Sequence, residues 1–312
     1  MNEIITTEGG GITAGQTITE ELFDRWTRYI DAKPRTVQTY TGNIKHFMRY
    51  LQEKGISQPA RKDILAYRDM LKESHKPATV QAYIMAVKLF FQWLEQENIY
   101  PDIARHIKGA KIGTEHKKDP LTAKQVGKVL NNINTDTLSG LRDYAVIALA
   151  VTGGLRTIEL ARADIDDMRT VGDFTALFVL GKGRDEKSEL VKVPEQVEEA
   201  IRAYLTARGK TEGKDPLFVS HANRNSGQRM TTRSISRIIK NRLKAAGYDS
   251  DRLTAHSLRH TAATINLLNG ASLEETQQLL RHTSINTTMI YAHALERAGN
   301  NSEERIAAAI FG

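Results

Sequence analysis

The chain has 312 residues, with 44 Lys and Arg against 37 Asp and Glu, so its formal net charge is +7, and it contains no cysteine. At about 150 residues per domain this length predicts two domains, and 40% hydrophobic with 26% charged residues is typical of a folded protein rather than a disordered one. The lack of cysteine excludes disulfides, thiolate nucleophiles and cysteine-bound zinc or iron–sulfur centres.

The sequence shows no targeting or membrane-spanning segment. Its N-terminus, MNEIITTEGGG, has acidic residues and no apolar core, unlike a signal peptide. The longest apolar run, residues 145–151, is far shorter than the ~20 residues that span a bilayer. We therefore expect a cytoplasmic protein. The basic excess suits a polyanionic partner, but by itself it is a weak indication.

The N-terminal third of the chain predicts a small helical domain. Residues 1–16, rich in Thr and Gly, are expected to form a flexible leader, and residues 17–100 a four-helix domain. The basic polar faces of these helices suit either solvent or nucleic-acid phosphates. Four apolar stripes at helical spacing carry the prediction: Leu22, Phe23, Trp26 and Ile30; Val37, Tyr40, Ile44, Phe47, Met48 and Leu51; Ile64, Tyr67, Met70 and Leu71; and Val80, Tyr83, Ile84, Val87, Phe90, Phe91 and Leu94.

Helical periodicity fades over residues 101–118, a basic segment marked by Gly and Pro that we interpret as a linker. Residues 119–312 then predict a second domain that is mostly helical. Two short β-rich runs, 175–180 and 189–193, flank Gly181-Lys182-Gly183 and predict a hairpin. The helices are expected near residues 126–133, 141–152, 197–205, 232–245, 255–270, 272–280 and 303–311, the second of them buried because it is apolar all round.

Four local groupings in the second domain carry reactive side chains. Taken singly, each has an ordinary structural explanation as a cap, a turn residue or core packing. His256 and His260, with His282 or His293, could in principle bind zinc, but position 257 is Ser and the glutamate of H-E-x-x-H is missing, so we expect no metal site and no cofactor. The groupings contain Arg156 after two glycines; Lys182; His256, Arg259 and His260; and His282 with Tyr291.

Together these side chains suit the stabilisation of an anionic phosphorus centre without a metal. The planar fork of arginine matches two non-bridging phosphate oxygens. A tyrosine hydroxyl, with a pKa of about 10, becomes a usable nucleophile near positive charge. Lysine or histidine can donate a proton to the leaving oxygen.

The order of these groups resembles the tyrosine recombinase (phage integrase) family over nearly the whole chain from about Thr17. The resemblance rests on three boxes: residues 141–156, ending in Thr152-Gly-Gly-Leu-Arg156; His256-Ser-Leu-Arg259-His260; and Leu280-Arg281-His282 followed by Tyr291 nine residues later. It implies a mainly α fold, with a four-helix SAM-like core-binding domain and a mostly helical catalytic domain carrying a small antiparallel sheet, known as the DNA breaking-rejoining fold.

The resemblance also implies a role for each site residue. Arg156 and Arg259 would bind the scissile phosphate, and Lys182 would protonate the leaving 5′ hydroxyl. His256 would act as general acid or base, and His282 would hydrogen-bond the phosphate. Tyr291 would attack phosphorus and form a 3′-phosphotyrosyl link. Because Lys187 and Lys192 lie near Lys182, the hairpin register leaves its assignment open.

The implied function is site-specific DNA recombination, for integration or excision of a mobile element or for replicon resolution. Double-stranded DNA is the expected partner, in a homo-tetramer, with accessory DNA-bending or directionality proteins as further candidates. Only about sixteen residues precede the first predicted helix, which favours an Xer-like two-domain member. The alternatives are a type IB-like topoisomerase and a catalytically silent DNA-binding regulator.

Two further features leave alternatives open. The apolar face of the last helix docks either on a neighbouring protomer or back on its own domain; its residues are Ile306, Ala307, Ile310 and Phe311. Arg281 stands where the family usually has glycine, and it either adds a phosphate contact or narrows the site. The pair Gly153-Gly154 has one glycine more than the family's common pattern.

Overall fold

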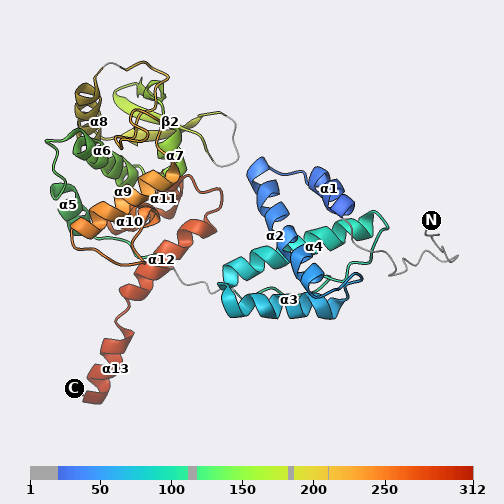
Figure 1. The fold of residues 1–312 in the computed structure, drawn as a ribbon. Helices are drawn as coiled ribbons and strands as arrows, with labels where there is room; N and C mark the ends of the chain where they lie inside the picture. Colours follow the sequence, from blue (N-terminus) through green and yellow to red (C-terminus); the bar gives the residue numbers. More distant parts are fainter. Residues whose placement is uncertain (1–19, 112–117, 182–185, 210, 312) are drawn as a thin grey trace. The chain divides into compact units, whose positions relative to one another are not determined.

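A computed structural model describes residues 20–111, 118–181, 186–209 and 211–311 (Figure 1). The chain divides after Glu115 into two compact units. Lys182, the candidate acid of the hairpin, lies outside the described residues.

The first unit is a helical bundle of α1 (Glu20–Tyr29), α2 (Pro34–Glu53), α3 (Arg61–Ser74) and α4 (Pro77–Gln96). The predicted apolar stripe of the second helix starts at Val37, and the helix itself begins three residues earlier, at Pro34. Proline fits there because the first helical turn needs no amide donor. The core is aromatic: Trp26 and Phe90 are buried and meet edge to face, with ring centroids 5.4 Å apart.

Part of the expected linker packs on this first unit. Ala104 and Ile107 are buried. Arg68, on α3, donates a hydrogen bond to the carbonyl oxygen of Lys108 at 3.2 Å. The chain therefore stays attached to the bundle for about ten residues beyond Tyr100, without helical periodicity.

The second unit is mostly helical and carries one three-stranded antiparallel sheet, so the predicted fold class is confirmed. The sheet has the order β1-β2-β3, with Val171 opposite Phe174 and Val179 opposite Glu189. The elements are α5 (Ala123–Asn131), α6 (Leu138–Thr152), α7 (Thr157–Arg162), the 3-10 turn η1 (Ile165–Asp167), β1 (Met168–Val171), β2 (Phe174–Val179), β3 (Glu189–Val193), α8 (Glu195–Arg208), α9 (Thr232–Ala245), α10 (Ala255–Leu268), α11 (Leu273–Leu280), α12 (Asn286–Ala298) and α13 (Ser302–Phe311).

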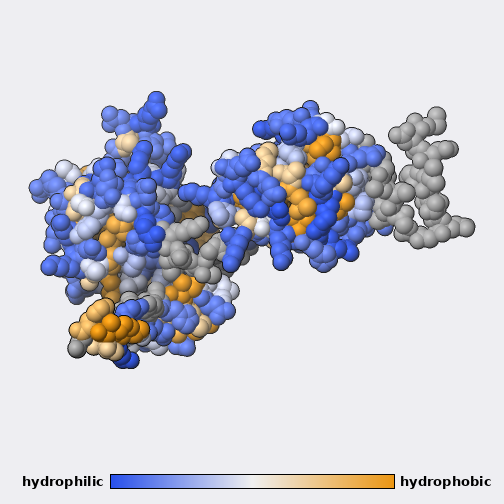
Figure 2. Space-filling model, turned by 90° about the horizontal axis from the view of Figure 1, so that it is seen from below, coloured by the Kyte–Doolittle hydropathy of each residue, from blue (hydrophilic) through white to orange (hydrophobic). Residues whose placement is uncertain are grey.

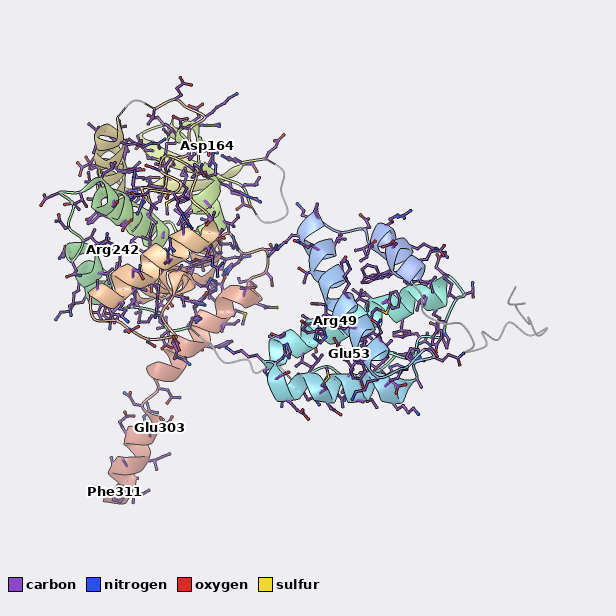
Figure 3. All side chains as sticks on the ribbon, in the orientation of Figure 1. Arg49, Glu53, Asp164, Arg242, Glu303 and Phe311 are labelled. Atoms are coloured by element: carbon purple, nitrogen blue, oxygen red, sulfur yellow. The ribbon has the colours of Figure 1, made fainter. Side chains whose placement is uncertain are left out.

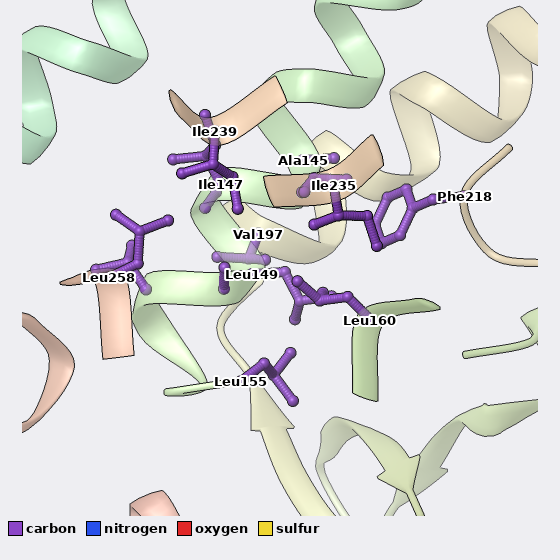
Figure 4. Packing of buried hydrophobic residues seen from close by; sticks show 14 of the residues in the cluster. Ala145, Ile147, Leu149, Leu155, Leu160, Val197, Phe218, Ile235, Ile239 and Leu258 are labelled. Atoms are coloured by element: carbon purple, nitrogen blue, oxygen red, sulfur yellow. The ribbon is translucent and has the colours of Figure 1, made fainter. Parts of the chain in front are cut away.

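Helix α6 runs through the core of the second unit. Its residues from Ala145 to Val151 are all buried, which confirms the prediction for its apolar sequence. Side chains of the surrounding helices and of the segment around Phe218 pack against it (Figure 4). Two ion pairs on the buried Asp143 add polar contacts: its carboxylate accepts from Arg142 at 2.6 Å and from Arg242 of α9, labelled in Figure 3, at 2.6 Å.

Four elements of this unit were not predicted. Strand β1 is short with two of its four residues exposed, α7 has only six residues, and η1 is a 3-10 turn of three. Helix α12 begins with Asn286 and two threonines, residue types whose side chains compete for backbone hydrogen bonds and disfavour helix interiors. In each case the local sequence pattern was too weak to predict the element.

Helix α13 has no buried residue and extends away from the rest of its unit (Figures 1 and 3). Ile306, Ile310 and Phe311 are 59%, 65% and 84% exposed, and they give this helix an apolar surface (Figure 2). The chain thus does not adopt the alternative in which this helix folds back on its own domain. In the part of the chain that the structure describes, no helix has both the length and the hydrophobicity to cross a membrane.

Candidate active site

The site is built around a glycine turn that follows α6. Gly154 adopts φ +55°, a left-handed conformation that favours glycine. A Cβ atom at this position would lie 2.8 Å from Cδ2 of Leu280. The turn therefore brings the end of α6 into direct contact with the end of α11, and it delivers Arg156 to the start of α7.

Arg156 is held by Glu159 of the first turn of α7. The backbone amide of Arg156 donates to Oε2 of Glu159 at 2.8 Å, and its Nη1 donates to Oε1 at 2.8 Å. Burial by itself would raise the pKa of Glu159, but Arg281 and Arg156 more than offset this and lower it. The carboxylate is therefore ionised at neutral pH, while the Arg156 side chain stays 27% exposed.

Arg259 of α10 is 2% exposed, far less than Arg156. Its Nη1 donates to the carbonyl oxygen of Gly154 at 2.5 Å, and its Nη2 donates to the carbonyl oxygen of Leu280. Burial and the nearby charge of Arg156 both lower the pKa of Arg259. Positive charge is thus concentrated here beyond what the one carboxylate balances, which is the electrostatic condition for binding an anion.

His282 lies two residues beyond the end of α11. Its Nδ1 is 3.0 Å from the hydroxyl oxygen of Thr288, at the start of α12. Burial, followed by the charges of Arg259 and Arg156, lowers the pKa of His282 to about 4. His282 is therefore neutral at physiological pH and can act as a hydrogen-bonding group rather than as a cation.

Tyr291 projects from α12 into the same site and is 7% exposed. Burial raises the pKa of its hydroxyl, whereas the charges of Arg259 and Arg156 oppose that rise. Its ring lies 5.2 Å from the ring of His260, which lies 4.5 Å from the ring of His256. The two arginines thus favour the phenolate, which is the nucleophilic form of the side chain.

His256 is exposed at the edge of the site, unlike the buried Arg259 one turn later. It lines a pocket of about 630 Å³ together with Arg156. Arg237 and Lys240 of α9 and the acidic Asp251 also line this pocket, so its wall carries a net positive charge. A pocket of this charge next to the buried arginines suits a phosphodiester backbone.

The structure brings five of the six predicted site residues into this region, and the sixth, Lys182, is not described. The two competing lysines are engaged elsewhere. Lys187 contacts Asp164 at 2.7 Å and Asp167 at 2.5 Å. Lys192 lies with its Nζ 4.6 Å from the ring centroid of Phe174, on the sheet.

Sequence reasoning missed Glu159 and gave no definite role to Arg281. A local signal existed for Glu159, since a carboxylate three residues after Arg156 faces it across one helical turn. Arg281 takes φ 53° and ψ 48° as the C-terminal cap of α11, which explains why glycine is usual at this position. Among the described residues, no group of three or more His, Asp or Glu side chains is arranged to hold a metal ion.

Comparison with known proteins agrees with this architecture. The Phage integrase family matches residues 120–297, and the phage integrase N-terminal SAM-like domain matches residues 21–100. The chain belongs to the phage integrase family. The expected family is therefore confirmed across both units.

The curated relatives are tyrosine recombinases. Tyrosine recombinase XerC of Corynebacterium glutamicum is 38% identical over 175 residues, covering 55% of this chain and 54% of that protein. The chain thus spans about half the length of that relative. Tyrosine recombinase XerD of Listeria monocytogenes is 30% identical over 271 residues, covering 83% of this chain and 87% of that protein.

Solved structures share the fold at lower identity. XerH site-specific recombinase bound to a palindromic difH substrate has a TM-score of 0.72 at 19% identity, covering 96% of this chain and 90% of that one. A lambda integrase tetramer bound to a Holliday junction has a TM-score of 0.67 at 18% identity, covering 89% of this chain and 78% of that one.

Proposed function

We propose that this integrase-family protein is a tyrosine-type site-specific DNA recombinase, which cleaves and rejoins DNA through a 3′-phosphotyrosyl intermediate. The observation that carries the proposal is the convergence of Arg156 and Arg259 on Tyr291. Both arginines act electrostatically on the buried tyrosine hydroxyl, and the exposed edge of Arg156 opens on a basic pocket. Strand transfer needs this combination of a nucleophile and an anion site.

The reaction combines these positions with the role that the family resemblance implies for Lys182. Arg156 and Arg259 bind the non-bridging oxygens of the scissile phosphate, and the phenol oxygen of Tyr291 attacks phosphorus as its proton passes to a base, for which His256 is the candidate. The bond from phosphorus to the 5′ oxygen breaks, and Lys182 protonates that oxygen. His282, held by Thr288, donates a hydrogen bond to the phosphate.

The phosphotyrosyl ester conserves the energy of the broken phosphodiester. A 5′ hydroxyl from another strand attacks it, Tyr291 leaves with its proton restored, and no nucleoside triphosphate is consumed. Preorganised positive charge supplies most of the rate enhancement in such a site. The buried, carbonyl-bound Arg259 is preorganised in this sense.

The partner is double-stranded DNA, and the assembly is a homo-tetramer. XerH and lambda integrase, which share the fold, have been solved on DNA, the latter as a tetramer on a Holliday junction. The exposed apolar face of α13 supports docking on a neighbouring protomer. The reaction would serve integration or excision of a mobile element or resolution of replicons in the cytoplasm, with DNA-bending or directionality proteins as candidate accessory factors.

Capture of covalent adducts tests the proposal. The purified chain is incubated with fragments of its host genome, denatured with SDS, and the DNA that stays attached to protein is sequenced. A recombinase yields adducts at one or a few sequences, with protein on the 3′ side of the break. Sequence-independent adducts, together with relaxation of any supercoiled plasmid, would instead identify a topoisomerase, and the absence of adducts a silent DNA-binding regulator.

A further inference from the structure

The side chain of Arg281 is buried beside the site and directed into the protein. It is 6% exposed, against 27% for Arg156. Its Nη1 donates to the carbonyl oxygens of Leu279 at 2.7 Å and Gly153 at 3.1 Å. Its Nη2 donates to the carbonyl oxygen of Gly154 at 3.2 Å and to Oε2 of Glu159 at 2.9 Å. With both terminal nitrogens bound to protein, Arg281 is poorly placed to contact a DNA phosphate.

Two of these acceptors are shared with the arginines proposed to bind phosphate. Oε1 of Glu159 accepts a hydrogen bond from the guanidinium of Arg156, and Oε2 accepts one from Arg281. The carbonyl oxygen of Gly154 accepts from both Arg281 and Arg259. Arg281 thus touches the partners of both phosphate-binding residues without lying in the basic pocket.

The charges explain what this sharing achieves. A buried carboxylate paired with a single arginine holds that arginine strongly, because the surroundings screen the pair poorly. Without Arg281, Glu159 would compete with the DNA phosphate for the guanidinium of Arg156. With Arg281 present, three guanidinium groups face one carboxylate, and the outer edge of Arg156 remains available.

We propose that Arg281 is a positioning residue that takes up the charge of Glu159 and so leaves Arg156 to bind the scissile phosphate. This inference rests on the proposed recombinase function. It assigns to Arg281 neither a phosphate contact nor a narrowing of the site. The arrangement depends on an arginine at a left-handed position where glycine would be less strained.

The test measures the rate of adduct formation with saturating DNA that carries a captured site. Arg281→Met removes the charge at similar length, and Arg281→Gly removes it while relieving the left-handed backbone. Both variants should slow cleavage by about 10- to 100-fold, the range for losing a hydrogen bond between charged groups. Both variants lose a buried ion pair and should melt at a lower temperature. Unchanged circular dichroism and DNA affinity at the assay temperature therefore separate slower cleavage from misfolding.

The decisive variant is the double substitution Arg281→Met with Glu159→Gln. If Arg281 acts by occupying Glu159, neutralising the carboxylate should restore about tenfold of the lost rate. The matched control is Arg229→Met, which removes another arginine from an ion pair in the same unit, with Asp164 at 2.5 Å. Glu159→Gln should restore nothing in that background.

Three results would overturn the inference. The first is cleavage by Arg281→Met at the wild-type rate. The second is failure of Glu159→Gln to restore activity, and the third is equal restoration in the Arg229→Met background. Each would contradict a role of Arg281 through Glu159. These failures differ from failure of the proposed function. In that case the wild-type protein itself forms no adduct on any DNA.

Discussion

The carbonyl oxygen of Gly154 accepts a hydrogen bond from Nη1 of Arg259 at 2.5 Å, although the two residues lie 105 positions apart in the chain. This bond joins the glycine turn after α6 to the buried face of α10. It orients the guanidinium of Arg259 without using a carboxylate, so the bond leaves its positive charge uncompensated. The geometry of the turn therefore determines where the phosphate-binding charge lies.

Gly154→Ala should destabilise the protein through this turn. The new Cβ would lie 2.8 Å from Leu280 Cδ2, on a backbone with φ +55°. We expect a loss of roughly 2–4 kcal/mol in the free energy of unfolding, about 1 kcal/mol from the backbone and the rest from overpacking. Denaturant titration of the variant and the wild type measures this loss in the free energy of unfolding.

Gly172 provides a matched control for Gly154. It also has a positive φ, of 60°, but a Cβ there meets nothing within 4 Å. Gly172→Ala should therefore cost only the backbone component, about 1 kcal/mol. Equal losses for the two variants would show that contact between the turn and Leu280 is not tight.

Lys182→Met should slow cleavage because the leaving 5′ oxygen loses its proton donor. A substrate with sulfur in place of that oxygen needs no protonation to leave, so it should restore the rate of the variant to near that of the wild type. General acid catalysis is typically worth about 10²- to 10⁴-fold. Single-turnover cleavage of the two substrates measures the effect.

Lys187→Met is the control for this experiment. Lys187 pairs with Asp164 and Asp167, so its loss should lower stability, and the sulfur substrate should give no selective rescue. Rescue of Lys187→Met but not of Lys182→Met would reassign the acid.

His282 should make the protein less stable as the pH falls from about 6.5 to about 4. Burial and the neighbouring arginines lower the pKa of His282 from 6.5 to about 4 in the folded state, so within this window the unfolded chain binds a proton that the folded chain does not. The stability due to neutral His282 is complete above pH 6.5 and is lost towards pH 4. His282→Gln should therefore show a smaller fall in melting temperature between pH 7 and pH 5. If the melting temperature of His282→Gln falls between pH 7 and pH 5 as steeply as that of the wild type, then His282 titrates normally in the folded protein and is not buried among the arginines.

Much of the fold followed from local patterns in the sequence. Helix α9 has the predicted bounds, 232–245, and α3 (Arg61–Ser74) contains the predicted apolar stripe, because apolar residues recur at helical spacing in both. Helix α12, which carries Tyr291, was not predicted. Its first turn is held by a side-chain contact between Thr288 and His282, six residues earlier, which helical periodicity does not reveal.

The site was predictable only in part for a related reason. The boxes around Arg156 and Arg259 identify residue types and order, but burial and pairing depend on segments distant in sequence. Arg281 contacts Gly154, 127 positions away in the chain, and hydrophobic periodicity does not predict such a contact. The pairing of Glu159 with Arg156 had a local signal, but its second partner, Arg281, lies 122 positions further along the chain.

Tyr291→Phe tests the central claim most directly. With a nicked suicide substrate that carries a captured site, the wild-type protein should accumulate an SDS-resistant adduct, and Tyr291→Phe should form none while binding the same DNA with unchanged affinity. Tyr248→Phe, at a tyrosine under Lys128 elsewhere in the unit, should form adducts as the wild type does. Adducts that persist in Tyr291→Phe would contradict the account, because another residue would then be the nucleophile.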